Sequence, residues 1–374
     1  MFPTDFTVTA SSFSGNKADI RVQYGVSSKP DPYIRPWPAA EERQWQSPDI
    51  EVKNTRNASD THWFNVPWID HDNTIVATVT NGGNLDAEDV EVTISEKNFN
   101  LGGVPAVTVL GTVVKDIPAL GKVEFEAPWI PSAGKHYCIS VVISKYSSPG
   151  GIDETSSSNN TAQSNYTRFI SASASPPTRE MTTVDVRNPF DEPTRVFIIP
   201  SQTNPFYRTY LQHRWLMLGA GETKTVKIMF EFAPDAAQKA TEQPNKKFIR
   251  IPNDVRFASY IEDPRLKPID AADLFSGAQV QVVTGRATEF QRFEAKGESV
   301  VGFVATKDNG QAVPGKIVIL RVVNQNDELG YKVVAFTAGT FEATVSKGWK
   351  KVSAFYPGRT NFGESTSKTV SAGN

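Results

Sequence analysis

Hydrophobic and polar residues alternate along two segments of the first half of the chain. In residues 72–94, Ile75, Ala77 and Val79 alternate with threonines, a Gly-Gly-Asn turn follows, and a second alternating run completes a hairpin. A period of two places every second side chain on one face of a strand, so this segment predicts two half-buried antiparallel strands. Residues 137–143 repeat the period. At least three strands are therefore expected to share one core.

The same alternation recurs to the end of the chain and predicts an all-β protein built from β-sandwiches. Further strands are expected at residues 122–129 and 160–169, then at 182–187, 195–199, 207–217 and 224–232, and finally at 299–306, 316–323, 331–336, 340–345 and 350–356. The predicted units are residues 1–48 (N-terminal strands and a connector), 49–170 (first sandwich), 171–285 (second sandwich) and 286–374 (third sandwich). The second sandwich carries an irregular insertion at residues 234–278, where segments 234–243 and 268–277 predict short helical turns.

Length and charge narrow the classes of partner. The 374 residues are too many for one sandwich of ~100 residues and fit about three. A charged fraction of 21% and a net charge of −2 create no field that would attract nucleic acid or an anionic membrane. No apolar run is long enough to span a bilayer, and the first residues lack the pattern of a signal peptide. The single cysteine excludes an intrachain disulfide.

Prolines and aromatic residues are interleaved in the connector. Pro30, Pro32, Pro36, Pro38 and Pro48 alternate irregularly with Tyr33, Trp37 and Trp45. Such a proline density predicts an extended, stiff segment. Two interpretations stay open: the rings pack on the following domain, or they present a binding strip. On the second interpretation, the candidate binding residues are Tyr33, Trp37 and Trp45.

A histidine flanked by two aspartates is the candidate metal site. His71 lies between Asp70 and Asp72 and could supply imidazole and carboxylate ligands. A closed site needs about four convergent ligands, and no second cluster with ligand spacing is present. We therefore expect a solvated turn leading into a strand, and no metal.

The other candidate catalytic groups favour structural roles. Cys138 and His136 point to one face of a predicted strand, but no orienting residue or oxyanion donor accompanies them, so Cys138 is expected to be an apolar filler. His213 falls in the alternation of residues 209–217 and predicts a hydrogen-bonded inner-face residue. Carboxylates are scattered over residues 180–192 and 254–273 without a catalytic motif. No catalytic residue and no cofactor are predicted.

Several motifs resemble the CARDB family, the cell-adhesion-related domain found in bacteria. They are PDI at 48–50, TVTNGGNLDAEDVEV at 78–92, W-x-P-x-x-G-K-H-Y at 129–137 and the asparagine pair at 159–160, and they cover about a third of the chain. The second unit resembles the immunoglobulin-like domains that follow CARDB units. The third resembles bacterial immunoglobulin-like domains at residues 302–306, 314–320, 339–341 and 349–356. These resemblances imply tandem immunoglobulin-like β-sandwiches and an extracellular or cell-surface location.

The expected function is non-enzymatic. The chain would be a structural or binding protein of tandem modules in a bacterial surface, secreted or particle assembly, acting in adhesion, spacing or docking. Its partners would be proteins, or further copies of itself, reached through strand edges, with glycan as a further ligand class. One alternative is the accessory C-terminal region of a secreted hydrolase, a protease or glycosidase whose catalytic domain lies outside this chain. Another is an enzyme with its site in residues 234–278.

The N-terminal strands generate a prediction about assembly. A short pair of strands near residues 6–9 and 18–24 is marginal alone and must pair with its own sandwich or with a neighbour's edge. Deletion of residues 1–26 is expected to leave the sandwiches folded and to abolish self-association in analytical ultracentrifugation. A truncated chain that fails to fold as a monomer would place the segment in an internal sheet instead.

Overall fold

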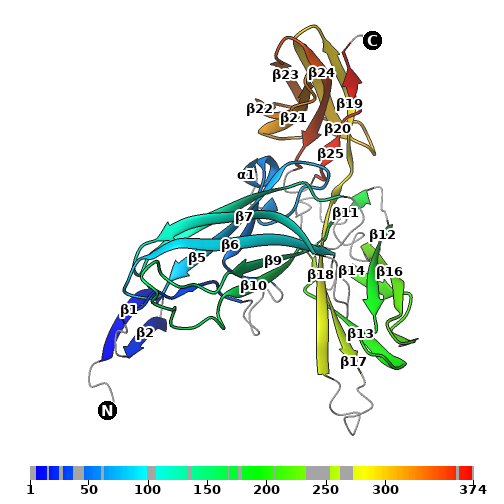
Figure 1. Cartoon of the computed structure of the whole chain (residues 1–374). Coiled ribbons are helices and arrows are strands. Elements are labelled where there is room, and N and C mark those ends of the chain that lie inside the picture. Colours follow the sequence, from blue (N-terminus) through cyan, green and yellow to red (C-terminus); the bar gives the residue numbers. More distant parts are fainter. Residues whose placement is uncertain are drawn as a thin grey trace.

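The structure is a computed structural model that confirms the all-β class, with several antiparallel sheets and hardly any helix (Figure 1). It describes residues 6–14, 17–24, 28–36, 46–59, 63–98, 107–132, 137–166, 168–175, 179–204, 207–232, 253–261, 273–358 and 362–372. Three hydrophobic cores lie along the chain, and we call the parts that hold them the first unit (28–166), the second unit (168–286) and the third unit (287–372). The only helix of the described residues is α1, Thr55–Ser59. No described helix is therefore long and apolar enough to cross a membrane.

The first unit is a sandwich of two four-stranded sheets. One sheet has the order β3 (Pro32–Tyr33), β5 (Asn73–Asn81) and β4 (Ile50–Lys53), with β8 (Lys122–Trp129) also on β5. The other has the order β10 (Thr161–Tyr166), β9 (Tyr137–Ile143), β6 (Ala87–Asn98) and β7 (Val107–Ile117). Inward side chains of both sheets form one core, as the alternation predicted.

Two aromatic residues anchor that core. Trp129 and Tyr137 are both buried, and their rings meet edge to face with centroids 5.2 Å apart. Each polar end has a partner: Trp129 Nε1 donates to Glu96 Oε2 at 2.7 Å, and the Tyr137 hydroxyl donates to the Ser132 carbonyl at 2.6 Å. The rings therefore bury apolar area without leaving an unpaired donor.

The second unit differs from its prediction in three places. Its smaller sheet has the order β12 (Arg179–Arg187), β16 (Thr223–Phe232), β14 (Tyr207–Leu211). Its larger sheet has the order β11 (Arg168–Ser175), β18 (Asp273–Arg286), β17 (Asn253–Ile261), β13 (Thr194–Gln202), β15 (Trp215–Leu218). The predicted closing strand at 160–169 is divided: β10 stays in the first unit, and β11 pairs in parallel with β18. The insertion holds two strands of the larger sheet, so the helical turn expected at 268–277 is wrong where β18 begins. Segment 234–243 lies outside the described residues.

His213 is the third difference. It is exposed in a bend between β14 and β15, not on the inner face of one long strand. The break shifts the alternation, so Leu216 and Leu218 face the core while Trp215 faces solvent.

The third unit follows its predicted strands closely. One sheet has the order β19 (Thr288–Lys296), β20 (Ser299–Thr306), β23 (Thr340–Thr344). The other has the order β22 (Leu329–Ala335), β21 (Ile317–Asn324), β24 (Trp349–Tyr356), β25 (Ser365–Thr366), with β26 (Val370–Ser371) also on β24. At the N-terminus, β1 (Phe6–Ser14) and β2 (Lys17–Tyr24) form a separate two-stranded sheet, and among described strands they pair only with each other.

A buried asparagine stabilises one end of the first two units in the same way. Asn81 and Asn188 are both fully buried. The Asn81 amide donates to three carbonyls and its oxygen accepts from two backbone amides. The Asn188 amide likewise donates to three carbonyls, and its oxygen accepts from the Phe190 amide. Each side chain thereby satisfies loop backbone groups that would otherwise be buried without partners.

These asparagines give a matched pair of predictions. Asn81→Ala leaves several buried backbone groups unsatisfied and is expected to destabilise the first unit by about 2–3 kcal/mol. Asn188→Ala is expected to act on the second unit in the same way. Hydrogen exchange read by mass spectrometry would localise each effect. Equal loss of protection in both units from either variant would contradict separate cores.

Candidate functional site: the junction of the first and third units

A fourth hydrophobic cluster joins two units that are far apart in sequence. Trp63, Val66 and Trp68 come from the segment between α1 and β5 in the first unit. Ile319 on β21 and Phe355 on β24 come from the third unit, and all five side chains are buried. We call this cluster the junction. Figure 1 shows α1 and the third unit lying next to each other at this place.

Ring contacts and hydrogen bonds cross the junction. The Trp68 ring lies 5.2 Å from Phe355 and 5.4 Å from Tyr331, centroid to centroid. Trp63 Nε1 donates to the Pro357 carbonyl at 3.2 Å, and the Asp72 amide donates to the Tyr331 hydroxyl at 3.0 Å. Polar ends of the aromatic side chains are thus satisfied by the opposite unit, which fixes the orientation as well as the distance of the two units.

A buried arginine also belongs to the junction. Arg56 on α1 places its guanidinium carbon 3.9 Å from the Trp63 ring centroid and 6.0 Å from that of Phe355. One of its terminal nitrogens donates to the Pro67 carbonyl at 2.8 Å. A desolvated cation over an aromatic face contributes about 2 kcal/mol, so Arg56 holds Trp63 at the interface.

His71 belongs to this junction, which corrects the expectation of a solvated turn. Its ring is half-buried and stacks on Trp68, with centroids 4.0 Å apart and planes 3° apart. Nδ1 lies 2.7 Å from the Ile69 carbonyl. Burial lowers the pKa of His71, and the charges of Arg321 and Arg56 lower it further. The imidazole is therefore held in its neutral form against the tryptophan.

The flanking aspartates do not form a metal cluster with His71. Asp70 and Asp72 are exposed, and Asp70 adopts a left-handed conformation with φ of 58° in the turn. Among the residues that the structure describes, no group of three or more His, Cys, Asp or Glu side chains could hold a metal ion.

The connector residues are only partly described. Tyr33 is half-buried in β3, opposite Thr80 of β5, and its ring lies against Gly82, where an added Cβ would be 3.1 Å from a ring carbon. The next residue, Ile34, is buried in the first core. This end of the connector is therefore an edge strand of the first unit. Trp37 and Trp45 lie outside the described residues.

Cys138 has the environment of a packing residue. It is buried in β9, and burial raises the pKa of its thiol to about 11. The thiol is consequently protonated near neutral pH and is a poor nucleophile. His136, the base that was considered for it, lies outside the described residues.

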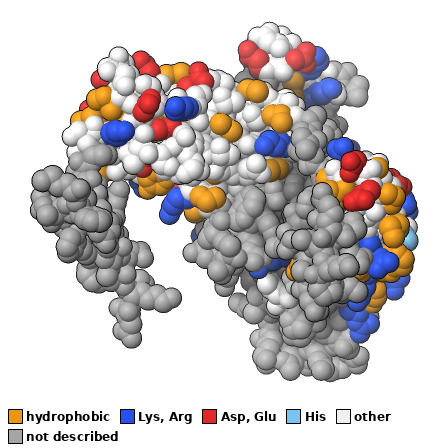
Figure 2. Space-filling model, turned by 60° about the horizontal axis from the view of Figure 1, so that its bottom comes forward, with side chains coloured by type: hydrophobic (Ala, Val, Ile, Leu, Met, Phe, Trp, Pro, Cys, Tyr) orange, Lys and Arg blue, Asp and Glu red, His pale blue; other side chains and the backbone are white. Residues whose placement is uncertain are grey.

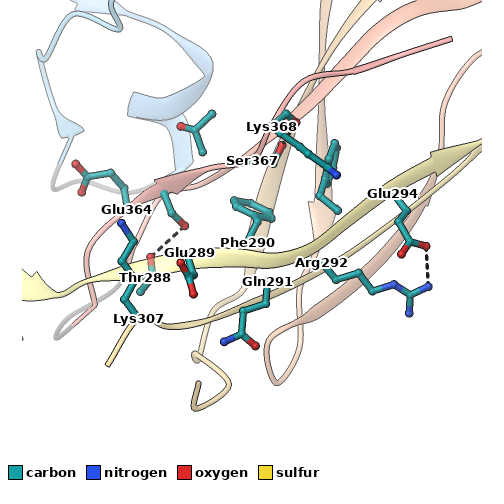
Figure 3. Close-up of a pocket in the computed structure, with 13 residues that line it drawn as sticks. Thr288, Glu289, Phe290, Gln291, Arg292, Glu294, Lys307, Glu364, Ser367 and Lys368 are labelled. Atoms are coloured by element: carbon teal, nitrogen blue, oxygen red, sulfur yellow. Dashed lines mark hydrogen bonds and ion pairs between the residues drawn. The ribbon is translucent and has the colours of Figure 1, made fainter. Parts of the chain in front are cut away.

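The third unit carries a shallow groove between the edges of its two sheets. Its volume is about 510 Å³. Figure 3 shows Glu289 and Arg292 projecting from β19, with Glu364 and Lys368 from the C-terminal segment nearby. Arg292 pairs with Glu294 at 2.9 Å. The lining carries both signs of charge and selects no class of ligand.

One feature of the sequence points to the junction, although it lacks the periodicity of a strand. Residues 62–68, HWFNVPW, hold three aromatic side chains in seven positions without strand alternation. Aromatic residues outside an alternating pattern are typical of interfaces. Which part of the chain they contact depends on the tertiary structure.

Comparisons with known proteins find similarity only among solved structures. No protein-family model and no curated protein sequence matches the chain. The CARDB domain of a Pyrococcus furiosus protein, solved in complex with di-metal ions, is 13% identical over 37% of this chain and 87% of that one, with a TM-score of 0.24. Escherichia coli alpha-2-macroglobulin activated by porcine elastase is 9% identical over 83% and 29%, with a TM-score of 0.23. The E. coli chaperone DraB is 12% identical over 56% and 96%, with a TM-score of 0.20. Similarities at these values indicate no function for this chain.

His71 generates a prediction about pH. A lowered pKa means that folding favours the neutral ring, so its contribution is complete above the ordinary value of 6.5 and is lost as the pH falls toward the lowered pKa. The junction is therefore expected to weaken below about pH 6.5. Tryptophan fluorescence and the distance between spin labels on the first and third units would follow the change.

Two variants test whether His71 is responsible. His71→Phe keeps a ring against Trp68 and should remove most of the pH dependence. His213→Gln, at an exposed bend, should leave it unchanged. An unaltered acid response in His71→Phe would assign the effect to other groups.

Proposed function

We propose that this chain is a non-enzymatic scaffold and binding protein of tandem immunoglobulin-like modules. The first unit is CARDB-like, and the protein acts outside the cell, in a bacterial surface, secreted or particle assembly. The observation that carries the proposal is the junction, where five buried side chains of two units form one apolar cluster. Such a contact gives a chain of modules a fixed shape.

A second contact supports rigidity where the second and third units meet. Arg286, the last residue of β18, forms a bidentate pair with Asp308, in which Nη2 donates to Oδ1 at 2.7 Å and Nε donates to Oδ2 at 3.2 Å. The two side chains are 21% and 23% exposed. The Arg286 carbonyl also accepts from the Gly363 amide at 2.9 Å. Bidentate arginine–carboxylate pairs fix direction as well as distance.

An exposed strand edge supports docking as the mode of binding. β7 is an edge strand of its sheet, and Val107, Val109 and Val114 on it are 50–58% exposed. Unpaired edges that carry β-branched residues accept a further strand from a partner. Proteins, or second copies of this chain, are therefore the proposed partners of the first unit.

The scaffold role is tested through the junction. Spin labels at Lys122→Cys and Lys347→Cys, which are exposed positions in the first and third units, should give one narrow distance distribution. Trp63→Ala removes a fully buried ring and its cation–π contact, so it should broaden that distribution. Phe64→Ala, a neighbouring aromatic that is 47% exposed, is the matched control.

Two results would contradict the proposal. A broad distribution in the unsubstituted chain would show that the units are not held together. Hydrolysis of a protein or polysaccharide substrate by the purified chain, retained through chromatography, would show an enzyme.

A further inference from the structure

Two asparagine–glycine pairs occur in the chain, and they lie in opposite environments. They are Asn81-Gly82 in the first unit and Asn309-Gly310 in the third unit. A backbone nitrogen that follows asparagine can attack the side-chain carbonyl carbon, and glycine obstructs this approach least because it has no Cβ. Asn81 is fully buried, whereas Asn309 and Gly310 are exposed in the turn that follows β20.

The side chain of Asn309 is folded over the peptide group that follows it. Its Oδ1 accepts from the Gln311 amide at 3.1 Å, and this hydrogen bond closes a ring that contains the peptide bond between Asn309 and Gly310. The same oxygen accepts from the Thr306 hydroxyl at 2.6 Å. Two donors on one carbonyl oxygen stabilise the negative charge that the oxygen acquires when its carbon is attacked. The side-chain carbonyl of Asn309 is therefore activated toward the Gly310 nitrogen.

The hydrogen bonds of Asn81 have the opposite effect. Its amide nitrogen, which would have to leave, donates to three carbonyls, and its oxygen accepts from the Asp31 and Gly83 amides. Reaction there requires the end of the first unit to open. In the exposed turn, the attacking nitrogen has to leave one backbone bond, in which Gly310 donates to the Thr306 carbonyl at 2.9 Å. Opening an exposed turn costs far less free energy than opening a core.

The exposed turn also holds the second unit. Arg286, at the end of β18, donates to both carboxylate oxygens of Asp308 and, through Nη1, to Gln311 Oε1 at 3.3 Å. Asp308 precedes the Asn309-Gly310 pair and Gln311 follows it. Arg286 therefore bridges this pair, and the length of backbone between its two partners decides whether it contacts both.

We propose that Asn309 deamidates spontaneously in the folded protein and that the product loosens the contact between the second and third units. The Gly310 nitrogen forms a bond to Asn309 Cγ, the bond from Cγ to Nδ2 breaks, and ammonia leaves with the proton of the Gly310 amide. Water then opens the resulting five-membered imide at one of its two carbonyls. One product is aspartate, and the other is isoaspartate, in which the backbone continues through Cγ.

The lengthened backbone, and not the added charge, is the effective change. Isoaspartate inserts one further carbon between Asp308 and Gln311, so Arg286 can no longer contact both. Figure 2 shows acidic and basic side chains intermixed over the described part of the visible face, so one more carboxylate creates no patch of a single sign. The deamidation itself does not depend on the proposed scaffold role.

The reaction is tested by incubating the full chain at mildly alkaline pH, followed by peptide mapping in a mass spectrometer. Asn309 is expected to convert at least tenfold faster than Asn81, and faster as the pH rises, because the attacking nitrogen must lose its proton. In water labelled with heavy oxygen, the product should carry one labelled atom. In urea, where neither pair is protected, the two should convert at similar rates.

Two results would overturn the site. In one, Asn309 stays unconverted in the folded chain while it converts in urea. In the other, Asn81 and Asn309 convert equally fast in the folded chain, which would show that the turn contributes nothing.

Spin labels test the effect on the contact. Lys227→Cys and Lys347→Cys are exposed positions in the second and third units, and their distance distribution should broaden as isoaspartate accumulates. Asn309→Gln, whose longer side chain disfavours the five-membered ring, should keep a narrow distribution after the same incubation. Asn309→Asp, which has the charge without the extra backbone carbon, should also stay narrow. An unchanged distribution in the converted chain, or equal broadening in Asn309→Gln, would overturn the proposed loosening.

Discussion

Packing of Trp63 and Trp68 against Phe355 is the contact on which the shape of the molecule depends. Sandwich units that are joined only by linkers move independently, because each unit has its own complete hydrophobic core. Here the first and third units share a buried cluster whose polar ends are satisfied across the interface. The second unit is connected to the others at both ends. The proposed spacing role depends on this contact, because the cluster sets the relative positions of the first and third units.

The two buried asparagines show how distinct sequences reach one solution. Asn81 is followed by Gly-Gly and Asn188 by Pro-Phe, yet each amide donates to three carbonyls at the end of its sandwich. An asparagine can donate and accept at once, so a single side chain satisfies loops that belong to different strands. The similarity of the first and second units therefore lies in hydrogen bonding and leaves little trace in the order of residues.

The alternation of hydrophobic and polar residues predicted most of the strands, but it predicted few of the tertiary contacts between them. Residues 299–306 were expected as a strand and are β20 with the same bounds, because alternation is a property of the strand itself. β17 was missed although Val255 and Phe257 alternate within it, because the whole stretch 234–278 was interpreted as an irregular insertion. The metal interpretation of His71 and the solvated-turn interpretation both considered only adjacent residues. His71 stacks on Trp68, three residues before it, but the partners of Trp68 in the third unit are distant in sequence. The hydrogen bond between Asp72 and Tyr331, which are 259 positions apart, illustrates that distance.

The junction also changes how the chain would respond to mechanical tension. A pull applied to the first and third units passes through the junction, because that contact is a shorter path than the polypeptide running through the second unit. The second unit is thereby shielded from force until the aromatic cluster separates. After that, the same pull would act on the parallel pair of β11 and β18, because β11 follows the first unit and β18 leads into the third unit. The molecule would thus lengthen in two stages: the junction separates first, and the second unit unfolds afterwards.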